Sequence, residues 1–213
     1  MKSNHYRGIG NEYRECSQDR LLTRLNNVYE LTPVLNAPYD HATDPTRDNK
    51  MFGTGFTVSK DLKSFKDEQF QCVWNFGFIQ RCPNILEEMK RVSRKYVLCF
   101  VPNGYNPGMI IHRLYHIFYS TTCYHPERGN PSLMTRNGIE LLFRRHHLRI
   151  VESGYIDICP WFDTVVTIKE LFGRRRREVI RLPFPKQILA FENLARPVAR
   201  IWAHHIWCLG SII

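Results

Sequence analysis

The chain has 213 residues, of which 43% are hydrophobic and 13% aromatic, and this composition predicts a globular protein with one sizeable core. Its net charge of +10 allows an acidic partner, such as nucleic acid, an anionic membrane surface or an acidic substrate, without choosing among them. No apolar run approaches the roughly 18 residues of a membrane span, and the polar start is not a secretory signal peptide, so we expect a cytoplasmic protein.

The first predicted helix has Ser17 as its N-cap. Its apolar face consists of Leu21, Leu22, Leu25 and Val28. Two short strands are expected next, at residues 33–38 and 56–59. About 30 residues separate Asp40 from Phe70, whereas two further strands with crossovers of a dozen or more residues each need roughly twice that number. We therefore expect one βα unit to be shortened or absent.

The stretch from Phe70 to Asn103 contains two apolar runs joined by a short amphipathic segment. Residues 70–78 and 96–102 have the length and the β-branched or aromatic content of buried strands. Asn84 is expected to cap the helix between them. The apolar face of this helix consists of Ile85, Leu86, Met89 and Val92. Such a βαβ unit predicts adjacent parallel strands that are covered on both faces. The strand residues that should then be buried are Cys72, Trp74, Val97 and Cys99.

The rest of the chain continues this alternation of helices and strands. The expected elements are a helix capped by Asn106, a helix started by Thr135, a strand at 148–158, an insertion at 164–185, a helix at 186–194 and a closing strand at 205–210. Trp161 and Asp163 follow the strand at 148–158, and open α/β sheets build their sites at such strand ends.

Cysteines and histidines give no sign of a metal site. The seven cysteines are widely spread and include no Cys-x-x-Cys pair, which favours reduced thiols that serve as small core residues. The histidine pairs His146-His147 and His204-His205 suit a shared metal poorly, because neighbouring residues on a strand point to opposite faces. The arginine run 174–177 has no interleaved aromatic residues, which favours a solvated loop over a nucleic-acid patch.

The central stretch also resembles a known family. The fourth and fifth strands of class I S-adenosylmethionine-dependent methyltransferases, type 11-like, are similar to the run WNFGFIQR at 74–81 and the run YVLCFVPN at 96–103. In the family the first run usually ends in Glu-His, where this chain has Gln80-Arg81. A Gly-rich turn normally follows the family's first strand, but this chain has no glycine between Glu30 and Phe52. The resemblance thus implies an abbreviated, degenerate N-terminal cofactor-binding half.

For the fold, the resemblance implies a Rossmann-like α/β domain. Its central sheet would be mostly parallel with an antiparallel last strand, and helices would cover both faces. We expect a single domain over residues 1–213. Its parts are an N-terminal helical cap at 1–30, an α/β core at 31–160, an insertion and helix at 161–204 and the last strand at 205–213.

For function, the resemblance implies methyl transfer from S-adenosylmethionine to an acceptor that the sequence does not identify. Catalysis in this family is mostly positioning, so no catalytic residue is assigned. The cofactor contacts implied by the resemblance are Asn36, Ala37, Pro38, Asp61, Asn75, Phe76 and Gly77. Two alternatives stay open: a non-catalytic homologue that acts as a binding or structural partner, and a basic nucleic-acid-binding protein.

Overall fold

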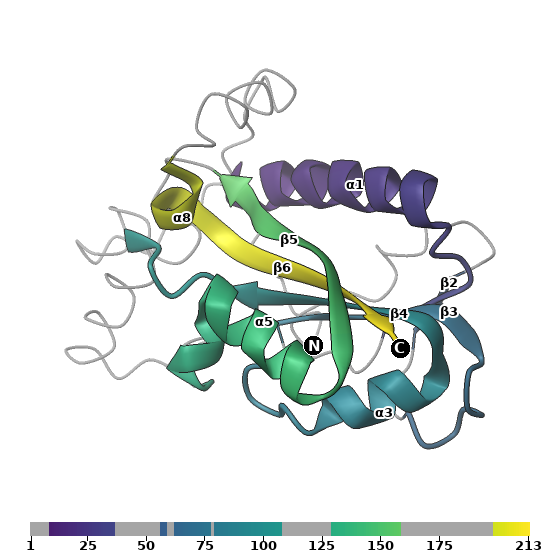
Figure 1. Cartoon of the computed structure of the whole chain (residues 1–213). Helices are drawn as coiled ribbons and strands as arrows, with labels where there is room; N and C mark the ends of the chain where they lie inside the picture. The colour runs from purple at the N-terminus through teal and green to yellow at the C-terminus, as the bar shows by residue number, and fades with distance from the viewer. Residues whose placement is uncertain (1–8, 37–55, 59–61, 78, 108–128, 159–197) are drawn as a thin grey trace, which may run out of the picture.

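The computed structural model of the protein describes residues 9–36, 56–58, 62–77, 79–107, 129–158 and 198–213. Their centre is a six-stranded sheet with the strand order β2-β1-β3-β4-β6-β5 (Figure 1). The strands are β1 (Val34–Asn36), β2 (Phe56–Val58), β3 (Phe70–Phe76), β4 (Ser93–Pro102), β5 (Leu148–Ile158) and β6 (Ala203–Ile212). The helices are α1 (Ile9–Tyr29), α3 (Ile85–Val92), α5 (Arg136–Arg145) and the short α8 (Ala199–Trp202), with a 3-10 helix at Pro131–Met134.

Strand pairing confirms the predicted fold class. β1 pairs in parallel with both β2 and β3, and β3 pairs in parallel with β4. β6 lies between β4 and β5 and is antiparallel to both, which is the placement that the resemblance implies for the last strand. Helix α1 covers one face of the sheet, while α3 and α5 cover the other (Figure 1). The molecule is therefore a Rossmann-like α/β sheet with one antiparallel strand.

Both faces of the central strands are buried, as the sequence predicts. The exposed fractions are 0% for Cys72, 2% for Trp74, 0% for Val97 and 0% for Cys99. On one face, Leu86 and Met89 of α3 pack with Phe143 of α5, and on the other, Leu22 and Leu25 of α1 pack on the sheet. Burial of each such side chain contributes about 1.5–3 kcal/mol, so these two layers supply the main stabilisation of the sheet.

The prediction that Ser17 caps the first helix is wrong. Helix α1 already begins at Ile9, so Ser17 lies inside it, and its Oγ accepts a hydrogen bond from the backbone N–H of Asp157 at 3.3 Å. Val28 is 60% exposed and does not belong to the buried face. The buried face of α1 instead continues from Leu25 to Tyr29, because residues four positions apart lie on the same side of a helix.

Helix α3 begins at the predicted residue, but the Asn84 side chain does not cap it. Asn84 has φ −63° and ψ −16° and makes no side-chain capping bond. A capping side chain normally needs an extended backbone, and Asn84 is already helical. The first N–H groups of the helix instead donate to backbone carbonyls, from Ile85 to Cys82 and from Leu86 to Pro83.

The connection from β2 to β3 is short. Its described residues, 62–69, form turns and bends and include no helix. The Arg91 guanidinium of α3 holds this segment, since it donates to the carbonyls of Leu62 and Phe65 at 3.0 Å each and contacts the Asp67 carboxylate at 2.6 Å. Residues 37–55 and 59–61 lie outside the described part, so the shortened βα unit and the degenerate cofactor-binding half stay predictions.

Several later elements are confirmed. Thr135 caps α5, with its Oγ1 accepting from the Gly138 N–H at 3.0 Å, and β5 has the predicted bounds. β6 is longer than the predicted strand at 205–210. Outside the described residues lie the predicted helix after Pro107, Trp161 and Asp163, the insertion at 164–185 with its arginine run, and the helix at 186–194. Of the helices in the described part of the chain, none is both long and apolar enough to cross a membrane.

Candidate functional site

The direction of the chain through the sheet changes between β1 and β3. From β1 the chain moves outward to β2, and then returns to β3 on the other side of β1. Asn36, the last residue of β1, is in register with Trp74, next to Asn75 on β3. Open α/β sheets bind ligands outside the carboxyl ends of their strands at such a switch point. Four of the predicted site residues, Asn36 and Asn75–Gly77, therefore lie at the carboxyl edge of the same two strands.

The turn that follows β3 is held by its own hydrogen bonds. The buried Asn75 accepts at Oδ1 from the N–H of Ile79 at 3.1 Å. The Gly77 N–H donates to the carbonyl of Phe100 at 3.0 Å, and the Gly77 carbonyl accepts from Gln80 Nε2 at 2.8 Å. Gly77 has φ 68°, a conformation that residues with a Cβ rarely adopt. This conformation favours glycine at position 77, and the hydrogen bonds of Asn75 and Gln80 fix the described residues on both sides of it.

Gln80 has a structural role in the turn after β3. Its side-chain amide donates to the Gly77 carbonyl, which an ionised carboxylate at this position could not do, because it is an acceptor alone. The backbone carbonyl of Gln80 also accepts from the N–H of Asn130 at 2.7 Å. A Cβ on Gly129 would lie 2.4 Å from Gln80 Cγ, so the segment before α5 packs directly on this side chain. Gln80 thus links the turn after β3 to the segment at 129–130.

A buried histidine and aspartate lie at the same edge of the sheet, and the sequence reasoning missed them as a pair. His205 Nδ1 at the start of β6 is 3.3 Å from Asp157 Oδ2 at the end of β5. The centroid of the His205 ring is 4.8 Å from that of Phe76, a predicted cofactor contact. Asp157 has φ 62° and its N–H donates to Ser17 of α1. No local pattern signals this group, because it joins three strands and a helix.

Two asparagines after β4 hold the start of β6 in place. Asn103 Nδ2 donates to the carbonyls of Ala203 at 2.8 Å and Arg200 at 3.0 Å, and the Asn103 N–H donates to the carbonyl of His204 at 2.8 Å. Asn106 Nδ2 donates to the carbonyl of Trp202 at 2.9 Å. The position of His205 beside Phe76 is thus set by hydrogen bonds from the end of β4.

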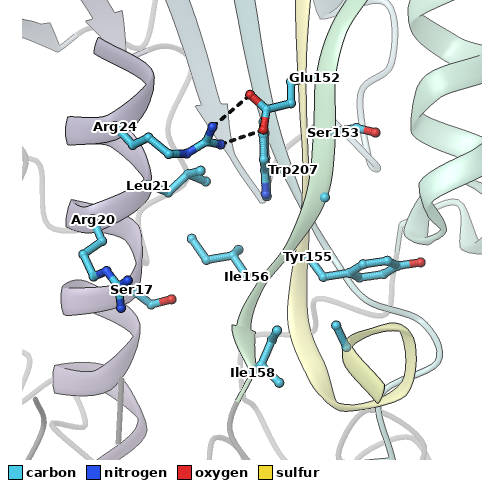
Figure 2. A pocket seen from close by; sticks show the side chains of 12 residues that line it. Ser17, Arg20, Leu21, Arg24, Glu152, Ser153, Tyr155, Ile156, Ile158 and Trp207 are labelled. Atoms are coloured by element: carbon cyan, nitrogen blue, oxygen red, sulfur yellow. Dashed lines mark hydrogen bonds and ion pairs between the residues drawn. The ribbon is translucent and has the colours of Figure 1, made fainter. Parts of the chain in front are cut away.

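A cleft of about 530 Å³ lies between α1 and β5 (Figure 2). It is lined by Ser17, Arg20, Leu21, Arg24, Glu152, Ser153, Gly154, Tyr155, Ile156, Ile158, Ala199 and Trp207. Most of these residues belong to α1 and β5. The cleft therefore lies beside the edge strand β5 and reaches Trp207 of β6, and β4 lies between β6 and the switch point.

The structure does not describe the other predicted site residues in full. Ala37, Pro38 and Asp61 lie outside the described residues, and of Asn36 only the backbone is described. Within the described ranges, no group of three or more His, Cys, Asp or Glu side chains could hold a metal ion.

Comparison with known proteins gives fold-level matches only. The sequence matches no protein-family model and no curated protein. Among solved structures, a SAM-dependent methyltransferase from Aquifex aeolicus is similar at 9% identity and a TM-score of 0.49, over 93% of this chain and 92% of that one. Magnesium protoporphyrin IX methyltransferase from Synechocystis PCC 6803, solved with bound SAH, is similar at 9% identity and a TM-score of 0.49, over 96% of this chain and 84% of that one. A SAM-dependent methyltransferase from Archaeoglobus fulgidus is similar at 15% identity and a TM-score of 0.41, over 93% of this chain and 97% of that one. The fold assignment rests on the strand order and pairing of this chain.

Proposed function

We propose that this protein binds S-adenosylmethionine at the switch point between β1 and β3 and transfers its methyl group to an acceptor. The observation that carries the proposal is the strand order. The resemblance in sequence assigns cofactor contacts to Asn36 and to Asn75–Gly77, and the pairing of β1 with β3 supports this assignment, because both segments end at the carboxyl edge of neighbouring parallel strands, where open α/β sheets bind ligands.

The residues at this edge fit a nucleoside ligand. Gly77 has the backbone conformation of a tight turn and carries no side chain to obstruct a ligand. The Phe76 ring, partly buried, offers an apolar surface beside this turn. Asn36, Ala37, Pro38 and Asp61 are the further proposed contacts, with the Asp61 carboxylate as the acceptor of hydrogen bonds from ribose hydroxyls.

When bound, the cofactor supplies a sulfonium methyl group that is already activated, so the protein's task is to position the acceptor. An acceptor that loses a proton on methylation also needs a base. The Asp157 carboxylate lies 3.3 Å from His205 Nδ1, so the two groups form a candidate acid–base pair. This pair, in contact with Phe76, is the group at the described edge that could take up such a proton.

Isothermal titration with S-adenosylmethionine and with S-adenosylhomocysteine tests the proposal. We expect both to bind with Kd values between about 1 μM and 1 mM, since the missing glycine turn weakens the contacts usual for the family. Phe76→Ala should weaken binding about tenfold by removing the apolar surface at the turn. Phe65→Ala is the matched control, because Phe65 is also partly buried and packs edge-on against another phenylalanine, Phe70, before β3. It should leave binding unchanged.

Two results would contradict this function: no binding of either compound at millimolar concentration to protein that is folded by circular dichroism, or equal losses in Phe76→Ala and Phe65→Ala. The first would favour the alternative of a non-catalytic homologue.

A further inference from the structure

The cleft between α1 and β5 has the size of a small-molecule site. Its volume of about 530 Å³ lies inside the range of about 300–1,000 Å³ that is typical of ligand pockets. Figure 2 shows Leu21 and Ile156 extending between α1 and β5. Trp207 of β6 and Ala199 of α8 complete the apolar lining. Ile156, Ala199 and Trp207 are buried beneath the cleft, whereas Leu21 is partly exposed, so Leu21 is the apolar side chain on which the body of a ligand could rest.

The apolar lining is held in a fixed arrangement. Trp207 is 4% exposed, and the guanidinium carbon of Arg24 lies 5.6 Å from its ring centroid. A Cβ on Gly154 would lie 3.0 Å from Trp207 Nε1, so the indole packs closely over this glycine of β5. Ile156 is 4% exposed and packs in the same cluster as Trp207. These contacts shape the lining before any ligand binds.

The charges in the cleft do not cancel. Glu152 pairs with Arg24 through two contacts, at 2.8 Å and 3.1 Å (Figure 2). It also receives a hydrogen bond from the Tyr29 hydroxyl at 3.4 Å. Arg20 lies one helical turn before Arg24 and also lines the cleft. No acidic side chain in the described part of the chain pairs with Arg20. One positive charge at the cleft is therefore left without a counter-charge from these residues.

We propose that this cleft binds a small ligand that combines one negatively charged group with an apolar or aromatic body. Arg20 would bind the charged group, since a guanidinium suits carboxylate, sulfonate and phosphate oxygens. Leu21 would contact the apolar body, with Ile156 and Trp207 packed beneath it. The cleft is separate from the proposed cofactor site, because β4 lies between β6 and the switch point between β1 and β3, although its lining residue Ser17 accepts a hydrogen bond from the Asp157 N–H.

The test uses anilinonaphthalenesulfonate, an anionic aromatic probe, and phenylnaphthylamine, its uncharged counterpart. Fluorescence titration should show that the folded protein binds both probes. Arg20→Gln should weaken binding of the sulfonate about tenfold, the effect of one lost charge-assisted hydrogen bond, and change binding of the uncharged probe less than about twofold. Arg94→Gln is the matched control, because Arg94 is exposed on β4, outside the cleft, and the same charge is removed. It should leave both affinities unchanged.

Amide chemical shifts locate the probe. On addition of the sulfonate, the shifts that change should belong to residues 17–24 of α1 and 152–158 of β5, and saturating S-adenosylhomocysteine should not displace the probe. Equal losses in Arg20→Gln and Arg94→Gln, shift changes confined to other segments, or no binding of the sulfonate would each overturn the proposal.

Discussion

Glu140 shows how one side chain ties α5 to the edge strand β5. The Ser153 hydroxyl donates to its Oε1, and Arg136 Nε lies 2.9 Å from the same oxygen. Partial burial raises the pKa of the Glu140 carboxyl, but the hydrogen bonds from Ser153 and Arg136 outweigh it, so its pKa lies below the ordinary 4.5. Because the folded-state pKa is lowered, the ionised carboxylate stabilises the fold above the ordinary pKa. This stabilisation is lost as pH falls through the lowered value.

We therefore predict that Glu140→Gln lowers the free energy of unfolding by roughly 0.5–1.5 kcal/mol at pH 7, the usual range for one hydrogen bond. The difference from the parent protein should shrink as the pH falls below about 4.5. Urea denaturation at a series of pH values measures this difference in the free energy of unfolding. Ser153→Ala, which removes one donor, should lessen this pH dependence. Parallel stability curves for the parent and Glu140→Gln down to pH 3 would contradict the assignment.

At the scale of elements, α5 depends on the 3-10 helix that precedes it. Thr135 caps α5 by accepting from the Gly138 N–H, and the Thr135 hydroxyl donates to the carbonyl of Ser132 at 3.0 Å. A Cβ built on Gly138 would lie 1.7 Å from that carbonyl oxygen. The absence of a side chain at Gly138 is therefore what lets the 3-10 helix at Pro131–Met134 pack against the first turn of α5.

We predict that Gly138→Ala destabilises the protein by roughly 1–3 kcal/mol through this overlap. Helix propensity alone predicts the opposite sign, a gain of about 0.5–1 kcal/mol for alanine over glycine. Denaturant unfolding distinguishes these two predictions, because it measures whether Gly138→Ala lowers or raises the free energy of unfolding. Asn137→Ala, at the exposed neighbouring position of α5, is the control and should be neutral or slightly stabilising. A gain of stability in Gly138→Ala would show that the segment before α5 moves aside without cost.

At the scale of the whole molecule, the central strands are closed to solvent. Cys72 of β3, Cys99 of β4 and Cys208 of β6 are each 0% exposed, whereas Cys82 lies exposed before α3. Burial raises the pKa of the Cys72 and Cys208 thiols, and also that of Cys99, so the reactive thiolate is disfavoured at all three.

We therefore predict that iodoacetamide labels Cys82 rapidly in the native protein, while the three buried cysteines react only when the sheet opens. Peptide mass spectrometry over time measures each site separately. Labelling in denaturant, where all four should react at similar rates, is the control. If Cys99 were labelled in the native protein as fast as Cys82, the two-sided burial of β4 would be wrong.

Much of the fold could be predicted because its signals are local. Each of the apolar runs that form β3, β4 and β5 lies within one short window of sequence. The same holds for Thr135 and the helix that it caps. The errors also have local causes. Asn84 and Ser17 are good capping residues by type, but whether they cap depends on where the backbone turns helical. The turn Asn75–Gly77 was found through its resemblance to a known motif.

The sequence by itself therefore determined the strands, most of the helices and the segment proposed to contact the cofactor. Tertiary structure alone decided which distant residues meet: His205 with Asp157 and Phe76, Gln80 with Gly129, and the cleft between α1 and β5. The physical reason is that such contacts depend on strand order and register, which pair residues far apart in the chain. A local hydrophobic pattern gives the face on which a residue lies, but not the partner that faces it.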